Sequence, residues 1–202
     1  MTEVIIQRRG LLDKYIGDAI MAFWGAPLPN PKSAADACRA AYGMLARLRE
    51  LNTSWKSQGI PELRIGVGIN TGEVIVGNMG SEKRFNYTIM GDAVNFGSRL
   101  EGLNKTYETE CLISETTKKE IENEPEFFIR ELDLVIVKGK KEPKKIFELI
   151  ERPLDELSKK TLEHFGRGRE CYIKGDWQQA IKEFKTALSY RDDGPSKIFL
   201  ER

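Results

Sequence analysis

The sequence predicts a domain of mixed strands and helices, of the α+β or α/β class, followed by a helical hairpin. Between residues 63 and 70, apolar side chains alternate with arginine, glycine and asparagine, which is the period-two pattern of a strand. Between residues 33 and 55, apolar side chains recur at three- and four-residue steps, as on one face of a helix. Strand patterns stop at Pro153 and only helical patterns follow, so we expect two units, residues 1–152 and 153–202.

The N-terminal segment predicts a short helix and a hairpin. Residues 2–9 have the pattern of a helix end, and Gly10 is a natural stop. Two short apolar runs, residues 11–15 and 19–23, flank a tight Gly-Asp turn, as in a β-hairpin. A proline-rich loop follows, and we expect Ser33 to cap the long helix.

The middle of the chain predicts two more strands and a second long helix. We expect a Thr-Gly turn to join the strand at 63–69 to a strand at 73–76, with a polar loop at 77–86. After a short apolar segment, a helix is expected from Gly91 to about residue 103, with Asp92 as its cap.

The remaining segments alternate strands with helices and then become helical. Strands are predicted at 111–113, 127–137 and 146–150, with a helix at 115–122 capped by Ser114 and a lysine-rich loop at 138–145. Beyond Pro153, helices are predicted at about 155–173 and 177–190, with a break at Gly175.

Composition restricts the classes of function. The 202 residues carry a net charge of +1, so no overall field attracts the chain to nucleic acid or an anionic membrane. No apolar run approaches the roughly 20 residues of a membrane span, and the first ten residues do not resemble a signal peptide. We expect a cytoplasmic location without nucleic-acid or membrane contact from this chain, and a membrane anchor upstream of it stays open.

The cysteine and histidine content restricts the metal chemistry. Cys38, Cys111 and Cys171 are far apart in apolar surroundings, which argues against a disulfide framework and indicates buried thiols. With His164 as the single histidine, a bound metal would need oxygen ligands, which suits Mg²⁺ or Mn²⁺.

Three short segments carry side chains suited to metal or phosphate chemistry. Asp18 follows Gly17 and could bind a divalent cation, although Gly-Asp is also a common turn dipeptide. Asn95 and Arg99 share one helical face and could hold a ribose oxygen and a phosphate, although a solvated face explains them equally well. The lysines after Val137 could meet a polyphosphate, although lysine runs are more often solvated loops.

Taken together and in this order, the segments resemble one family, the class III adenylate/guanylate cyclase catalytic domain. The resemblance is carried by LDKYIGDAIMAFWGAP, by RIGVGINTGEVIVGNMGSEKRFNYTIMGDAVNFGSRLEGLNK and by VKGK, and it extends from about residue 4 to residue 150. It implies an α+β fold with a mostly antiparallel sheet flanked by helices. It also implies a head-to-tail dimer that converts ATP to 3′,5′-cyclic AMP and pyrophosphate in signal transduction.

The resemblance assigns roles to two residues of the predicted hairpin and to one residue later in the chain. Asp18 matches the second of two aspartates that bind two Mg²⁺ or Mn²⁺ ions per site. Lys14 matches the residue that donates to adenine N1, where guanylate cyclases typically have glutamate. Thr88 matches the second purine-reading position, and the Lys/Thr combination is that of a bacterial adenylate cyclase subgroup.

Three further roles concern the sugar and the phosphates. Asn95 matches the residue that orients the ribose, and Arg99 matches the residue that stabilises charge on the α-phosphate in the transition state. Lys138 matches the lysine that meets the terminal phosphates.

The sequence departs from the family pattern before Lys14. The family's first metal-binding aspartate lies on an earlier strand, whereas only about thirteen residues precede Lys14. We therefore expect that strand and that aspartate to be absent, and this chain alone to be inactive or nearly so. The incomplete sheet predicts a homodimer or an oligomer that exchanges segments between chains.

The C-terminal segment has a resemblance of its own. Residues 175–188 look like the second half of a tetratricopeptide-type repeat, and one such repeat does not form a stable solenoid. We expect the segment either to pack on the first unit or to begin a truncated helical region, and its apolar stripe favours packing over partner binding. Two alternatives to the cyclase interpretation remain. One is a catalytically incomplete cyclase-like module that dimerises or binds nucleotide, and the other, based on residues 155–190 alone, is a helical-repeat scaffold.

Overall fold

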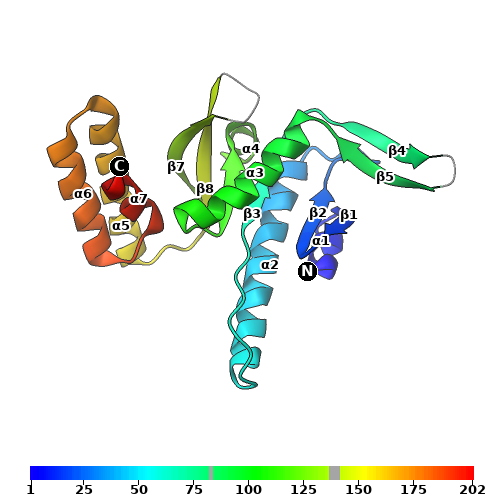
Figure 1. The fold of residues 1–202 in the computed structure, drawn as a ribbon, viewed down its shortest axis with the longest axis horizontal. Coiled ribbons are helices and arrows are strands. Elements are labelled where there is room, and N and C mark those ends of the chain that lie inside the picture. Colours follow the sequence, from blue (N-terminus) through cyan, green and yellow to red (C-terminus); the bar gives the residue numbers. More distant parts are fainter. Residues whose placement is uncertain (82–83, 137–141) are drawn as a thin grey trace.

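A short helix and a hairpin precede the long helix, as predicted. The computed structural model describes all residues except 82–83 and 137–141. Helix α1 (Thr2–Gln7) leads into strands β1 (Leu11–Ile16) and β2 (Ala19–Phe23), which pair antiparallel, and α2 (Ser33–Lys56) follows (Figure 1).

The predicted cap of α2 is wrong. Ser33 is the first helical residue, and the N-cap is Lys32, which makes no capping hydrogen bond through its side chain. The acidic residue of the first turn, Asp36, instead accepts a hydrogen bond from Asn30 Nδ2 at 2.9 Å. The loop before the helix is therefore held by an asparagine that the sequence pattern did not single out.

A four-stranded sheet forms the centre of the fold. Its strand order is β3-β6-β8-β7, and only the β3–β6 pair is parallel, so the sheet is mostly antiparallel, as the resemblance implied. The strands are β3 (Val67–Ile69), β6 (Cys111–Ser114), β7 (Phe127–Ile136) and β8 (Pro143–Glu151). The predicted strand at 63–69 is shorter than expected, because β6 pairs only with residues 67–69 and the Asn52 side chain binds both backbone groups of Leu63 instead.

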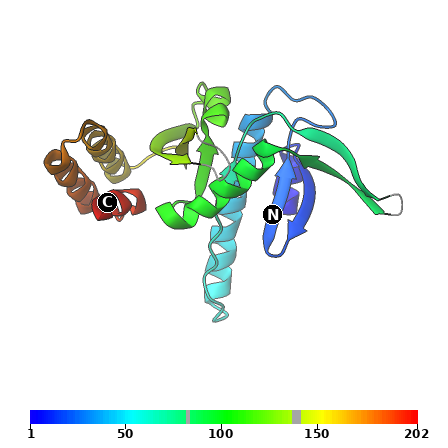
Figure 2. The same ribbon diagram turned by 45° about the horizontal axis from the view of Figure 1, so that its top comes forward.

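The predicted polar loop at 77–86 is wrong. This segment belongs to a long antiparallel hairpin of β4 (Ile75–Ser81) and β5 (Arg84–Met90), which extends away from the rest of the chain (Figures 1 and 2). The predicted strand at 73–76 therefore begins later and pairs with β5 rather than with β3. Burial does not alternate along β4, so the ribbon lacks the apolar alternation by which strands are usually recognised.

Two layers of helices cover the two faces of the sheet. Helix α2 packs with α4 (Glu115–Ile121) on one face, where Cys111 and Ile113 of β6 point. Helix α3 (Asp92–Tyr107) covers the other face, where Leu112 points. This alternation along β6 is the period-two pattern of a strand that is buried on both sides.

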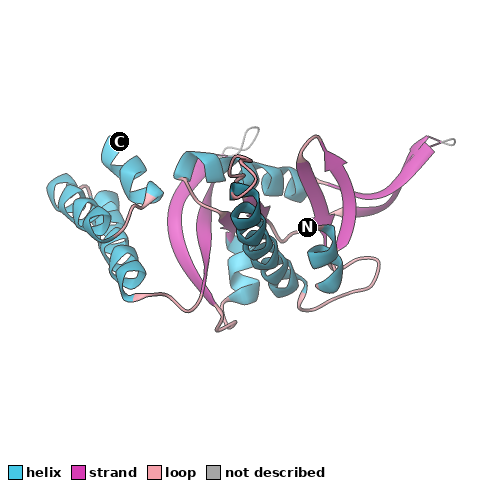
Figure 3. Cartoon of the chain, turned by 90° about the horizontal axis from the view of Figure 1, so that it is seen from below, coloured by secondary structure: helices cyan, strands magenta, loops and turns pink. Residues whose placement is uncertain are grey.

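The C-terminal region contains three helices rather than the predicted hairpin. They are α5 (Glu156–Lys174), α6 (Trp177–Tyr190) and α7 (Gly194–Glu201), at one end of the structure (Figures 1 and 3). Asp193 caps α7 by accepting a hydrogen bond from the backbone of Ser196. The boundary at Pro153 and the tetratricopeptide-type interpretation stay predictions.

The helical region shares a core with the sheet. Three phenylalanines, Phe165, Phe184 and Phe199, lie in one buried cluster with residues of α3, β7 and β8. Beside this cluster, the buried guanidinium of Arg130 on β7 donates to Asp193 at 2.8 Å and to Glu148 at 2.7 Å. Among the helices in the described part of the chain, none is long and apolar enough to cross a membrane.

Candidate active site

The structure brings together two side chains that are 74 residues apart in the sequence. Lys14 on β1 donates from Nζ to the hydroxyl oxygen of Thr88 on β5, at 3.0 Å. The threonine is 6% exposed, and the lysine side chain is 39% exposed. The two residues therefore form a small polar site with a buried floor and a solvent-accessible cation.

A third residue of this site, Asp13, was missed by the sequence analysis. The Thr88 hydroxyl donates to Asp13 Oδ2 at 2.5 Å, and Asp13 Oδ1 lies 3.4 Å from Lys14 Nζ. Neighbouring residues of a strand normally point to opposite faces, but the register of β1 shifts between Leu12 and Lys14. Such a bulge re-aims side chains, which explains how Asp13 and Lys14 reach the same partner.

Asp18 lies in the turn of the same hairpin. Gly17 has a φ of +62°, a conformation that glycine adopts without steric cost, and it sets the tight turn between β1 and β2. The side chain of Asp18 is exposed and makes no hydrogen bond or ion pair with another described residue. A carboxylate presented in this way is free to bind a ligand from outside the hairpin.

Asn95 and Arg99 lie on α3, which begins directly after β5. The N-cap of α3 is Gly91, which has a φ of +148°. Asp92 is therefore the first helical residue, and the prediction that it caps the helix is wrong. Asn95 is exposed and Arg99 is half-buried, and within the described ranges neither side chain has a hydrogen-bond or ion-pair partner.

The position of α3 is fixed by its contacts with β3. Asn104 is 3% exposed and donates from its side-chain amide to the carbonyl of Val67 at 3.0 Å. A Cβ at Gly68 would lie 2.2 Å from the backbone nitrogen of Glu101, so the helix approaches the strand as closely as only glycine allows. The helix that carries Asn95 and Arg99 is thus held rigidly against the sheet.

Two parts of the predicted site are not assembled by the described residues. Lys138 lies outside the described residues. Across residues 1–81, 84–136 and 142–202, no group of three or more His, Cys, Asp or Glu side chains could hold a metal ion. The carboxylate of Asp18 does not by itself supply the octahedral oxygen cage that Mg²⁺ prefers.

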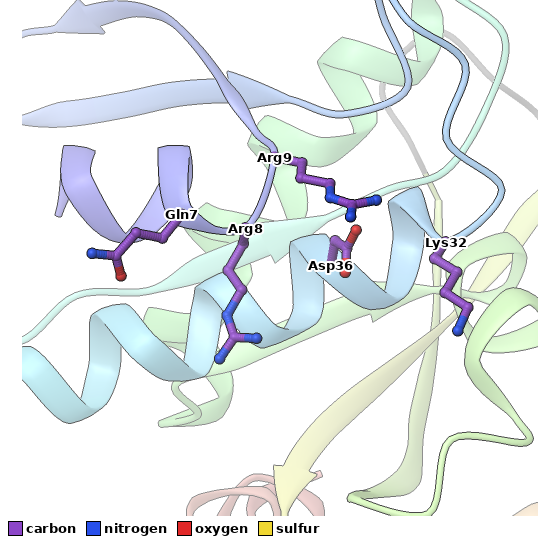
Figure 4. A pocket seen from close by; sticks show the side chains of 5 residues that line it. All are labelled: Gln7, Arg8, Arg9, Lys32 and Asp36. Carbon is purple, nitrogen blue, oxygen red and sulfur yellow. The ribbon is translucent and has the colours of Figure 1, made fainter.

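A hollow of about 420 Å³ lies elsewhere, between the end of α1 and the start of α2 (Figure 4). It is lined by Gln7, Arg8, Arg9, Lys32 and Asp36. None of the predicted site residues lines it. The polar site at Thr88 and the turn at Asp18 are therefore surface features of one chain rather than walls of this hollow.

Comparisons with known proteins identify a family that matches most of this chain. The sequence model of the adenylate and guanylate cyclase catalytic domain matches residues 4–150. Adenylate cyclase 1 of Rhizobium meliloti is 36% identical over 149 residues, which are 74% of this chain and 22% of that protein. The terminal-differentiation specific adenylate cyclase of Dictyostelium discoideum is 35% identical over 199 residues, covering 96% of this chain and 9% of that protein. The chain thus spans less than a third of the length of these relatives.

Solved structures give the same result. The adenylyl cyclase CyaB from P. aeruginosa has a TM-score of 0.68 at 32% identity, with 76% of this chain and 78% of that chain covered. The guanylyl cyclase Cya2 has a TM-score of 0.67 at 34% identity, with 77% of each chain covered. The chain belongs to the adenylate and guanylate cyclase catalytic domain family.

Proposed function

We propose that this chain is the catalytic region of an adenylate cyclase, which converts ATP to 3′,5′-cyclic AMP and pyrophosphate in signal transduction. The observation that carries the proposal is the contact between Lys14 and Thr88 at 3.0 Å. Similar proteins named as adenylate cyclases support it, at 35–36% identity. A guanylyl cyclase structure matches at a comparable TM-score, so the preference for adenine over guanine depends on the residues of the site.

The Lys/Thr pair suits adenine. Adenine presents an acceptor at N1 and a donating amino group at the 6-position, whereas guanine presents a donor and an acceptor in the reverse order. A lysine ammonium can only donate, and a threonine hydroxyl oxygen can accept. With Lys14 at N1 and Thr88 at the 6-amino group, both hydrogen bonds are satisfied by adenine, whereas the N1–H of guanine cannot accept a hydrogen bond from Lys14.

Asn95 and Arg99 supply the residues for the reacting part of the nucleotide. Positioning of the ribose hydroxyl and stabilisation of charge at phosphorus are the main tasks of a protein in phosphoryl chemistry. An amide and a guanidinium on one face of a rigid helix can perform both tasks on the same nucleotide. Both side chains are without protein partners among the described residues, which leaves them available to a ligand.

The active form is proposed to be a homodimer, or an oligomer that exchanges segments. The two hairpins that carry the site also carry exposed apolar side chains, namely Tyr15, Ile16, Ile75, Phe85 and Met90. Large apolar side chains exposed on the same two hairpins that carry the site favour a surface that another chain covers. In such a dimer, Asp18 of one protomer would face the purine and ribose residues of the other.

The family resemblance implies Mg²⁺ or Mn²⁺, and Asp18 is the proposed ligand. The residues described in this structure do not fit a complete two-metal site within one chain, because no group of three or more His, Cys, Asp or Glu side chains among them could hold a metal ion. The chemistry that this chain's own residues support is therefore base recognition by Lys14 and Thr88, ribose orientation by Asn95, and charge stabilisation by Arg99.

The proposal is tested by assaying the protein of natural length with ATP or GTP and Mn²⁺ or Mg²⁺. Cyclic AMP is expected as the main product, and Asp18→Ala should abolish it. Arg99→Ala should lower kcat about 10²- to 10³-fold, the usual effect of removing one donor that stabilises transition-state charge. Lys14→Glu should weaken ATP preference, whereas Lys185→Glu, at an exposed position on α6, should leave the preference unchanged.

Absence of any cyclic nucleotide from the wild-type protein would defeat the enzyme assignment. The alternative of a dimerisation or nucleotide-binding module would then be favoured, provided that the protein still binds ATP. ATP preference that survives Lys14→Glu would defeat the assignment of Lys14 alone.

A further inference from the structure

The contacts around Thr88 occupy both the hydrogen and one lone pair of its hydroxyl group. A hydroxyl has one hydrogen to donate and two lone pairs that accept. Thr88 donates this hydrogen to Asp13 Oδ2 at 2.5 Å, and one lone pair of the hydroxyl oxygen accepts from Lys14 Nζ at 3.0 Å. One lone pair remains, so toward a ligand Thr88 can act only as an acceptor.

The Asp13 carboxylate, which leaves Thr88 able only to accept from a ligand, lies in an unusual environment. The side chain of Asp13 has no exposed area, and its Oδ1 is buried without a hydrogen-bond partner, with Lys14 Nζ 3.4 Å away. A buried oxygen whose ion pair with Lys14 is not matched by a hydrogen bond is costly and calls for an explanation beyond stability. The bulge in β1 is what turns this carboxylate toward Thr88.

We propose that Asp13 is a positioning residue that determines base specificity. By holding the Thr88 hydrogen, it prevents this hydroxyl from donating to the 6-oxo group of a guanine-type base. The pair then presents one donor, Lys14, and one acceptor, Thr88, which is the complement of a 6-aminopurine. This inference rests on the proposed function, because it takes Lys14 to bind N1 of the purine.

The test compares ATP with inosine triphosphate, which has a 6-oxo group but lacks the 2-amino group of GTP. In the protein of natural length, Asp13→Leu removes the acceptor at similar side-chain size. The ratio of kcat/KM for ATP to that for inosine triphosphate should fall about 10-fold, the typical effect of one exchanged hydrogen bond. Asp13→Asn keeps a carbonyl acceptor and should retain most of the preference.

A matched control removes an equivalent carboxylate elsewhere. Asp133 accepts a hydrogen bond from the Tyr107 hydroxyl at 2.5 Å, outside the candidate site. Asp133→Leu should lower stability but leave the ATP preference unchanged. In a Thr88→Val background there is no hydroxyl to orient, so Asp13→Leu should have no further effect on the ratio.

The outcomes separate the two proposals. If ATP is cyclised and Asp13→Leu leaves the ratio unchanged, the role of Asp13 is refuted and the proposed function stands. If the wild-type protein makes no cyclic nucleotide, the proposed function fails, and competition of ATP and inosine triphosphate for binding decides the role of Asp13. Equal binding ratios in wild type and Asp13→Leu would then refute it.

Discussion

Replacing Gly68 with alanine tests whether α3 is held against β3 as tightly as the structure indicates. The new Cβ would lie 2.2 Å from the nitrogen of Glu101, 2.4 Å from the carbonyl oxygen of Gly97 and 2.8 Å from the carbonyl carbon of Leu100. All three are backbone atoms of α3, so no side-chain rotation can relieve the contact. Reaching the 3.0 Å below which real Cβ contacts essentially never fall requires α3 or β3 to move by about 0.8 Å in a close-packed core.

This displacement should be visible in stability and in catalysis. Overpacking of a core costs about 1–3 kcal/mol. With a urea dependence of about 1–3 kcal/mol per molar, the midpoint of unfolding should fall by roughly 1 M. Because Asn95 and Arg99 lie on the same helix, they should be displaced with it. The kcat of the natural-length protein should therefore also fall, by up to about 100-fold for a displacement near 1 Å.

A control on the same helix keeps the result interpretable. A Cβ at Gly102 would meet nothing within 4 Å, so Gly102→Ala should raise stability by about 0.5–1 kcal/mol through helix propensity alone. Urea unfolding followed by circular dichroism measures both variants. A Gly68→Ala protein that unfolds at the wild-type urea concentration would refute the close approach of helix and strand.

Three other changes have defined outcomes. Arg130→Met should lower the free energy of unfolding by about 3–5 kcal/mol in urea denaturation, since it leaves buried carboxylates without their cation; a midpoint equal to that of wild type would contradict this. Burial raises the pKa of the Cys38 thiol to about 12, so iodoacetamide at pH 8 should leave Cys38 unmodified in the folded protein. In urea the same thiol should be alkylated, and mass spectrometry distinguishes the two results. Ser114→Ala removes the cap of α4 and should lower the melting temperature by an amount equivalent to about 1 kcal/mol; an unchanged melting temperature would show that the cap contributes nothing.

The elements that the sequence predicted well carry a signal in their own local residues. The β1–β2 hairpin was predicted from its apolar runs and its Gly-Asp turn, and the Ser114 cap was predicted from local chemistry. Both predictions are confirmed. The β4–β5 ribbon was missed because burial does not alternate along β4. Helix α7 was missed because it has only eight residues and is held by Asp193 and by distant aromatic side chains.

The candidate site was predictable only in part. The family resemblance pointed to Lys14 and Thr88, and the structure places their side chains in contact. The third member, Asp13, depends on a one-residue irregularity in strand register, which alternation of side chains cannot reveal. Contacts of this kind come from tertiary structure, and no local pattern of the sequence announces them.

The core that the helical region shares with the sheet has a consequence for how the molecule opens. Phe199 of α7 lies in the same cluster as Phe96 and Leu100, which directly follow Asn95 and Arg99 in α3. Elements that share one core tend to unfold as one cooperative unit. Detaching the C-terminal helices would expose the apolar side of α3 to water. A mechanical pull on the chain near Pro153, or cleavage by a protease there, would therefore loosen the helix that carries Arg99.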